Sequence, residues 1–354
     1  MGAVVGLLGG WLMAQAPELG ADPAQAEAVE VEPPPVWRFK YKERKVKVVV
    51  LAGSIGAWPK QPYAERFAAM CKNVEVRNLS KVGYGAFQLR QRFKQQFLDN
   101  PHVDLKDASL EYWLVFQGGL NSVGTPERTN HDIREMILLA HARGLKVVAL
   151  SLTPWGDESD KRRWGGIGGL RYLRATRKVV DFVTGALAPP EALGEFAARR
   201  PGGAEGAWQA DERPDVAVDL YRSSLRAVDA PLRDVAAMRT ALEKDRTWQR
   251  HSQELDPNAR EAAIQRDAEE AAEIPRWFLR SDLRSFDHIH PNTEGHRLIA
   301  ETACPHLPES WGCTCPRAAA APESDREVPP QLPTATLLLL YPHWLRVLLG
   351  ATGL

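Results

Sequence analysis

The segment Val48-Val-Val-Leu-Ala-Gly-Ser-Ile-Gly56 joins an apolar run to a turn of small residues. Three valines and a leucine in succession are typical of a strand that is buried on both faces, as the strands of parallel sheets are. The turn that follows exposes the hydroxyl of Ser54 at the carboxyl end of this strand. Ligands of open α/β sheets bind at the carboxyl ends of the strands. The segment therefore predicts a parallel α/β sheet with Ser54 at its ligand-binding edge.

Strand and helix patterns alternate along the rest of the chain. Four more strands are predicted, at Val74–Leu79, Tyr112–Gln117, Leu145–Leu152 and Asp215–Tyr221. Helices are predicted at Tyr63–Met70, Ala86–Leu98, Thr125–Arg143 and Leu170–Leu187. This alternation is typical of α/β proteins. We expect a three-layer α/β/α domain over residues 44–312, with a mostly parallel five-stranded sheet and helical insertions.

Two segments interrupt the alternation. Residues 188–214 are rich in Ala, Gly, Pro and charged residues, which indicates a loop or insertion. Residues 230–276 are polar and helical in pattern. A lid, a partner surface and a solvated helical hairpin all fit this second insertion, and its polarity favours the hairpin. The glycine-rich turn Gly165–Gly169 is expected beside the site.

A second segment with chemical potential is Ser285-Phe-Asp-His-Ile-His-Pro-Asn-Thr-Glu-Gly-His-Arg-Leu-Ile-Ala300. Its Asp287 and His290 lie three residues apart in a loop. At that spacing the carboxylate can accept the Nδ1–H of the imidazole and leave Nε2 as a base. A histidine taken alone is more often a surface or capping residue. The nearby carboxylate and the serine after the first strand favour a catalytic interpretation.

The end of the same segment predicts the last helix of the domain. The helix is expected over Glu294–Thr302, with Asn292 or Thr293 as its N-cap. Gly295 would let the first turn of this helix pack closely against its surroundings.

Together these segments resemble the SGNH (GDSL-like) hydrolase family. That family has an Asp-x-x-His pair followed by Pro-Asn and Gly-His, which matches Asp287-His-Ile-His-Pro-Asn292 and Gly295-His296. Its glycine block is similar to Asn78-Leu-Ser-Lys-Val-Gly83, and its Gly-x-Asn block is similar to Gly118-Gly-Leu-Asn121. The resemblance covers roughly residues 44–304. It implies a flavodoxin-like fold.

The resemblance also implies roles for individual residues. Ser54 would be the nucleophile, His290 the base and Asp287 the residue that orients the imidazole. The backbone amides of Ser54 and Gly83 and the side-chain amide of Asn121 would form the oxyanion hole. No cofactor is implied. The substrate would be a small-molecule or glycan ester, such as an O-acetyl glycan or another small acyl ester, or a lipid.

Two positions depart from the family pattern. Gly53 stands where an aspartate usually precedes the serine, and Ser122 stands where an aspartate usually follows the asparagine. Because neither position supplies the nucleophile or the base, an acyl hydrolase remains the favoured interpretation. The alternatives are an O-acetyltransferase of a cell-envelope polysaccharide and a catalytically inactive binding protein of the same fold.

Aromatic residues follow several of the predicted strand ends. Trp58, Tyr84, Phe87 and Trp155 would line a sugar or acyl pocket, with ordinary packing as the alternative.

A metal site is not predicted. The run His288, His290 and His296 lacks the i, i+4 histidine pair of a helical zinc motif. We interpret His296 as a residue that packs against or caps the last helix.

Charge composition argues against nucleic-acid partners. The chain of 354 residues has 45 Lys and Arg and 45 Asp and Glu, so its formal net charge is zero. A general polyanion binder needs a surplus of basic residues to contact phosphates.

The two ends of the chain differ from the rest in composition. Residues 1–16 combine an apolar run with the small-x-small end Ala14-Gln-Ala16, which indicates a signal peptide or a hydrophobic arm. Residues 17–43 are rich in Pro, Ala and Glu and predict a linker. The tail, residues 313–354, ends in an apolar segment broken by Pro342, which favours peripheral membrane contact over a full span. We expect an exported protein, periplasmic, extracellular or associated with the envelope.

Four cysteines are consistent with export. Cys304 is expected to pair with Cys313 or Cys315, while Cys71 stands alone in the sequence. Free thiols in a reducing compartment are the alternative.

Overall fold

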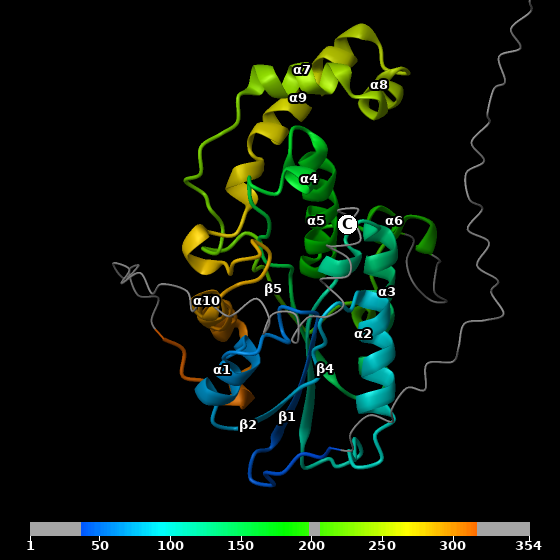
Figure 1. The fold of residues 1–354 in the computed structure, drawn as a ribbon. Helices are drawn as coiled ribbons and strands as arrows, with labels where there is room; N and C mark the ends of the chain where they lie inside the picture. The colour runs from blue at the N-terminus through cyan, green and yellow to red at the C-terminus, as the bar shows by residue number, and fades with distance from the viewer. Residues whose placement is uncertain (1–36, 198–205, 317–354) are drawn as a thin grey trace, which may run out of the picture. The chain divides into compact units, whose positions relative to one another are not determined.

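The computed structural model describes residues 37–197 and 206–316, and within them five strands form one parallel sheet. Their order across the sheet is β2-β1-β3-β4-β5, with all four pairings parallel (Figure 1). The strands are β1 (Val46–Ala52), β2 (Val74–Asn78), β3 (Glu111–Gln117), β4 (Lys146–Leu150) and β5 (Val216–Val218). The predicted fold class is confirmed, and each predicted strand overlaps one of the five.

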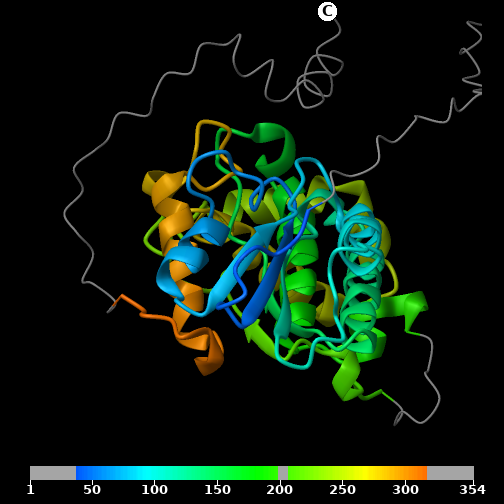
Figure 2. The same ribbon diagram turned by 90° about the horizontal axis from the view of Figure 1, so that it is seen from below.

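Helices cover both faces of this sheet, which gives three layers (Figures 1 and 2). One face packs on α1 (Tyr63–Met70) and α10 (Thr293–Ala303). The other packs on α2 (Ala86–Phe93), which continues as a π-helix over Lys94–Leu98, and on α3 (Pro126–Ala142) and α5 (Gly168–Thr184). Short α4 (Lys161–Trp164) precedes α5, and residues 165–167 of the predicted turn join the two helices, while Gly168 and Gly169 already belong to α5.

Alternating residues of β1 explain why its sequence is apolar without interruption. Val48 and Val50 belong to the core shared with α1 and α10. Val49 and Leu51 belong to the core shared with α2, α3 and α5. All four side chains are fully buried. A central parallel strand buried on both faces needs this pattern, as the sequence indicated.

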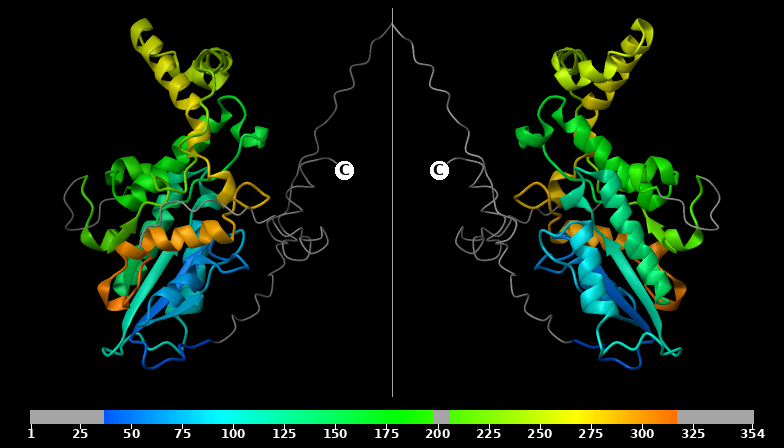
Figure 3. Two further views of the ribbon diagram at one scale, coloured as in Figure 1. Left: turned by 90° about the vertical axis from the view of Figure 1, so that its left-hand side faces the viewer. Right: turned by 90° about the vertical axis from the view of Figure 1, so that its right-hand side faces the viewer.

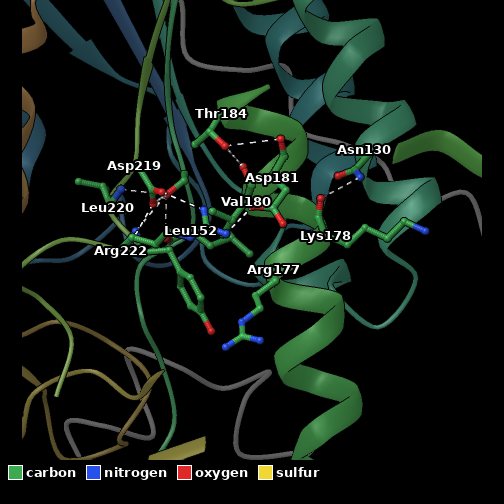
Figure 4. A network of polar contacts seen from close by, with 12 residues as sticks. Asn130, Leu152, Arg177, Lys178, Val180, Asp181, Thr184, Asp219, Leu220 and Arg222 are labelled. Carbon is green, nitrogen blue, oxygen red and sulfur yellow. Dashed lines mark hydrogen bonds and ion pairs between the residues drawn. The ribbon is translucent and has the colours of Figure 1, made fainter. Parts of the chain in front are cut away.

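β5 is shorter than the predicted Asp215–Tyr221 because the chain leaves the sheet after Val218. The N–H groups of Leu220 and Tyr221 donate to the hydroxyl of Ser151 rather than to a neighbouring strand. Arg222 then donates to Asp219 and to Asp181 of α5 (Figure 4). These contacts fix the segment after β5 against β4 and α5.

The long polar insertion forms α7 (Val235–Lys244), α8 (Arg246–Ser252) and α9 (Pro257–Ala272), with α7 and α9 side by side (Figure 3). Its polar surface was predicted, but it is more than a solvated hairpin. Leu242 and Ile264 join the core on the α5 side of the sheet. Arg174 of α5 also donates to Asp267 and Glu270 of α9. The insertion is therefore attached to the domain by apolar and ionic contacts.

The first insertion is packed where the structure describes it. Its helix α6 (Pro189–Leu193) places Ala192 and Leu193 in the core. Farther along, Glu212 accepts from the guanidinium of Arg134 in a buried ion pair. Residues 198–205 of this insertion lie outside the described residues.

The predicted end of the linker, residue 43, is too far along the sequence, because the domain already begins at residue 37. Trp37 stacks on Phe97 with ring centroids 6.0 Å apart. The N–H groups of Lys40 and Tyr41 donate to the carboxylate of Glu75 at 2.5 and 3.0 Å. These contacts make residues 37–43 part of the domain, which the sequence alone hid because the segment is rich in lysine. The predicted boundaries at residues 16 and 17 fall outside the described range.

Two disulfides bind the end of the described chain to the domain. Cys304 pairs with Cys315, one of the two predicted partners. Cys71 pairs with Cys313, so the expectation that it stands alone is wrong. The reason is a backbone contact between distant segments: Asn73 N–H donates to the carbonyl of Trp311. This contact brings the end of α1 beside residues 311–314.

Within the described ranges no helix is long and apolar enough to cross a membrane. The predicted signal peptide, and the tail beyond residue 316 with its apolar segment, lie outside those ranges.

Candidate active site

Ser54 lies directly after β1, where the sequence placed it. Its side chain is almost buried, with 7% of the residue exposed. Ala57 N–H donates to the carbonyl of Gly53 at 3.1 Å and closes the turn around the serine. The hydroxyl of Ser54 is thereby held at the carboxyl edge of the sheet.

Ser54 meets His290 and Asp287 in one hydrogen-bonded chain. The Oγ of Ser54 lies 2.6 Å from the Nε2 of His290. On the other side of the ring, Nδ1 of His290 contacts Oδ2 of Asp287. With the proton on Nδ1, the imidazole donates to Asp287 and accepts from the serine hydroxyl. All three residues proposed from the sequence therefore come together in the geometry of a nucleophile, a base and an orienting carboxylate.

The second oxygen of Asp287 holds the loop in shape. Its Oδ1 accepts from the N–H groups of Ile289 and His290 at 3.1 and 3.0 Å and from the hydroxyl of Ser285 at 2.9 Å. His288 between them has a φ of 60°, in the left-handed region, and its carbonyl accepts from Gly156 N–H. One carboxylate therefore orients the imidazole and the backbone that carries it. Sequence reasoning missed Ser285 and Gly156 because their contacts depend on this loop conformation.

The carboxyl of Asp287 stays ionised far below neutral pH. Burial by itself would raise the pKa of its carboxyl, because the charged form loses hydration. The hydrogen bond and charge of His290 and the two backbone N–H donors outweigh burial and lower the pKa to about 2. A permanent carboxylate next to Nδ1 favours the tautomer in which Nε2 accepts from Ser54.

The start of α10 fixes the loop from its other end. Asn292 is the N-cap, and its side-chain oxygen accepts from Gly295 N–H at 2.9 Å. A Cβ on Gly295 would lie 2.5 Å from the carbonyl of Leu283, so only glycine fits there. The prediction of a cap at Asn292 or Thr293 is confirmed for Asn292, as is the close packing at Gly295.

Asn121 and Gly83 lie on two loops that approach the serine. The side-chain nitrogen of Asn121 donates to the carbonyl of Tyr84 at 3.1 Å and passes close to Gly53. Gly83 has a φ of 79°, which glycine adopts without strain. Within the described chain, the N–H groups of Ser54 and Gly83 donate no hydrogen bond to another residue. These donors suit the three oxyanion positions proposed from the sequence.

The structure gives physical reasons for both departures from the family pattern. A Cβ at Gly53 would lie 3.3 Å from the carbonyl of Tyr84 and 3.4 Å from the side-chain nitrogen of Asn121. Those loops therefore approach more closely than an aspartate there would comfortably allow. Ser122 uses its hydroxyl to accept from Ala86 N–H at 3.2 Å. It thereby ties the Asn121 loop to the start of α2.

The aromatic residues proposed as pocket walls differ in position. The prediction is wrong for Trp155, which is buried in the core and donates its indole N–H to Thr176 of α5. Phe87 is 43% exposed and lies against the guanidinium of Arg90. Tyr84 is half-buried beside Asn121. Trp58 is half-buried and stacks on the ring of His290.

A cavity of about 360 Å³ adjoins the loop of Asp287. Arg284, one residue before Ser285, lines it and pairs with Asp157. Leu232 and Phe278 give it apolar walls. Ser54, Asp287 and His290 do not line this cavity, so it borders the start of the loop and not the serine.

The histidine-rich run does not form a metal cluster in the described ranges, where no three potential ligands gather. His288 and His290 lie on the loop, while His296 is a buried residue of α10 whose ring stacks on Trp58 and Tyr63. The interpretation of His296 as a packing residue is confirmed.

No protein-family model and no curated protein matches the chain. Among solved structures, it is similar to a member of the lipolytic G-D-S-L family from Veillonella parvula, with 12% identity and a TM-score of 0.39, over 73% of this chain and 96% of that one. It is also similar to a lipase/acylhydrolase from Enterococcus faecalis, with 15% identity and a TM-score of 0.36, over 77% and 99%. An acetylxylan esterase from Geobacillus stearothermophilus, solved as a catalytic mutant, has 12% identity and a TM-score of 0.35, over 80% and 100%. The chemistry proposed below rests on the geometry of this chain's own residues.

The buried imidazole of His296 makes folding sensitive to acid. Burial, with the nearby charges of His290 and Arg66, lowers the pKa of His296 to about 3, from the ordinary 6.5. Between these values the unfolded chain binds a proton that the folded chain does not. Stability is therefore complete above pH 6.5 and falls as the pH drops towards 3, by about 1.4 kcal/mol per unit.

We predict that His296→Phe, which keeps a ring in the stack, removes most of this acid dependence. Urea unfolding between pH 6.5 and 5.5 would measure it, in a range in which ordinary carboxyls stay largely ionised. His306→Gln, which changes an exposed histidine, is the matched control and should keep the wild-type slope. An equal slope in wild type and His296→Phe would show that His296 does not cause the dependence.

Proposed function

We propose that the protein is a serine hydrolase that cleaves a carboxylic ester through an acyl-serine intermediate. The observation that carries the proposal is the hydrogen-bonded chain from Ser54 through His290 to Asp287. These three groups satisfy the needs of acyl transfer: a hydroxyl, a base in contact with it and a carboxylate that orients the base.

The first half of the reaction forms the acyl-serine. As Oγ of Ser54 attacks the ester carbonyl carbon, its proton moves to Nε2 of His290. The resulting imidazolium is stabilised by Asp287, and the carbonyl oxygen becomes an oxyanion. When the bond to the alcohol breaks, His290 gives its proton to the leaving oxygen. Water then attacks the acyl group by the same steps and releases the carboxylic acid and Ser54.

The oxyanion would be held by three uncharged donors. These are the backbone N–H groups of Ser54 and Gly83 and the second N–H of the Asn121 side chain, whose first N–H contacts Tyr84. Neutral donors stabilise the developing negative charge without binding the carboxylate product too tightly. Ser122 and Gly53 let the two donor loops approach the serine.

We predict that Ser54→Ala and His290→Ala each lower kcat/KM by on the order of 10⁴- to 10⁶-fold, because the two groups act as a unit. The double variant should be little worse than either single one. Activity would be measured on esters from acetyl to long acyl, because the proposed chemistry does not fix the length of the acyl group. Circular dichroism would check folding.

Ser109→Ala is the matched control for this series, because it removes an exposed hydroxyl at the amino end of β3. It should keep full activity, and a fluorophosphonate should label it and the wild type at Ser54. Near-normal turnover by Ser54→Ala would end the proposal.

We predict that Asn121→Ala lowers kcat about a hundredfold with little change in KM, because an oxyanion donor contributes on the order of 3 kcal/mol only as charge develops. Asn121→Asp should be slower still, since a carboxylate repels the oxyanion. Steady-state kinetics on the best ester of the panel would measure both. If Asn121→Ala turns over normally while the wild type labels at Ser54, the oxyanion assignment is wrong and the nucleophile stands.

We also propose that the protein works outside the reducing cytosol. Two disulfides join its four cysteines, and disulfides persist in oxidising compartments. Protein from its native host is expected to lack residues 1–16. Its intact mass should be that of the remaining chain less four hydrogens, which are lost when the two disulfides form. Full-length protein with four thiols would contradict this.

A further inference from the structure

Four aromatic rings form a column that begins at the imidazole of the candidate base. Trp58 stacks on His290 with ring centroids 5.7 Å apart and planes 23° apart. The indole also stacks on His296, at 5.9 Å and 30°. His296 in turn stacks on Tyr63 of α1, at 6.1 Å and 26°. The column therefore links the site to the α1 side of the core.

The turn that carries the nucleophile also carries the indole. Trp58 follows Ser54 by four residues, and the backbone N–H of Trp58 donates to the carbonyl of Ile55 at 3.4 Å. The position of the indole relative to His290 is therefore fixed by the same backbone that fixes the serine hydroxyl.

We infer that Trp58 is a positioning residue that stabilises the protonated form of His290. The inference rests on the proposed function, in which the imidazole becomes an imidazolium in each half-reaction. The face of an indole is electron-rich and attracts a cation within about 6 Å of its centroid. The neutral imidazole gains less from this contact than the imidazolium does, so the contact favours the transition state.

The second imidazole that stacks on the indole, that of His296, is uncharged at neutral pH. Burial keeps the pKa of His296 far below neutral pH. His296 therefore does not add a second positive charge against Trp58 when His290 is protonated. The charge of Arg66 of α1 also lowers the pKa of His296.

The groups that contact His290 act from different directions. Asp287 acts at the ring edge through Nδ1, and Ser54 contacts Nε2. Trp58 acts on the ring face, with His296 and the charge of Arg66 behind it. Removing the indole therefore changes the stabilisation of the imidazolium while the hydrogen bonds at both nitrogens remain.

This role differs from the one predicted for Trp58 from the sequence, that of a wall of the substrate pocket. Both imidazoles stack on the indole, which is only half-buried. Substrate binding and stabilisation of His290 also differ in what they change, which makes them separable by experiment.

The test is an NMR titration of the His290 imidazole in the full chain, for wild type, Trp58→Phe and Trp58→Leu. His290→Gln identifies the signal among the nine histidines. In Trp58→Leu the titration midpoint is expected to fall by about 0.4 to 1.5 pH units, and kcat/KM by about 2- to 30-fold with KM unchanged. Trp58→Phe keeps an aromatic face and should shift less. Tyr41→Leu, which removes a 48% exposed ring beside Glu75, is the control and should match the wild type.

An unchanged midpoint in Trp58→Leu overturns the inference. If KM also rises, Trp58 contacts the substrate instead, as the sequence predicted. If Trp58→Leu does not fold, Trp58→Phe decides by the same criterion. The titration needs no substrate. If the midpoint shifts but the protein hydrolyses no ester, the effect of Trp58 on His290 is supported and only the proposed function is contradicted.

Discussion

The hydrogen bond between Ser54 and His290 joins two residues that are 236 positions apart in the sequence. Ser54 lies just after β1, and His290 lies just before α10. The two residues meet at 2.6 Å because α10 packs, with α1, on one face of the sheet that contains β1. The cap at Asn292 and the glycine at position 295 fix the direction in which α10 starts. The disulfide from Cys71 to Cys313 joins the far ends of these two helical segments.

Gly53 and Ser122, the two positions at which the sequence departs from the pattern that it resembles, both lie at the loops beside the serine. Without a side chain at position 53, the Tyr84 and Asn121 loops come close to the serine. Ser122 replaces the expected carboxylate with a hydroxyl that accepts from the first turn of α2. Both changes act on the loops that carry the proposed oxyanion donors rather than on the nucleophile or the base. The chemistry of the triad and the placement of the donors are therefore separate requirements.

Local patterns predicted most of the fold and the triad. The valines of β1 indicated burial on both faces because successive side chains point to opposite faces, and the Asp-x-x-His spacing is short enough for one loop to position both groups. Features that depend on distant contacts were not accessible. Cys71 lies beside Cys313 because the backbone of Asn73 is hydrogen-bonded to that of Trp311. Trp155 turns into the core because Thr176 accepts its N–H, which no pattern around the tryptophan indicates.

The separation between the two halves of the site also bears on the order of synthesis and folding. The sheet can be assembled when residue 218 has been made, and Ser54 is then already at its edge. His290 is made only later, in the segment before α10. The disulfide of Cys71 can form only after Cys313 has been made, and it closes a loop of 242 residues. Closing so long a loop removes much of the freedom of the unfolded chain, on the order of 5 kcal/mol in the chain-entropy account. A nascent or truncated chain would therefore contain the proposed nucleophile without its proposed base, and Ser54 would gain its partner only when the domain is complete.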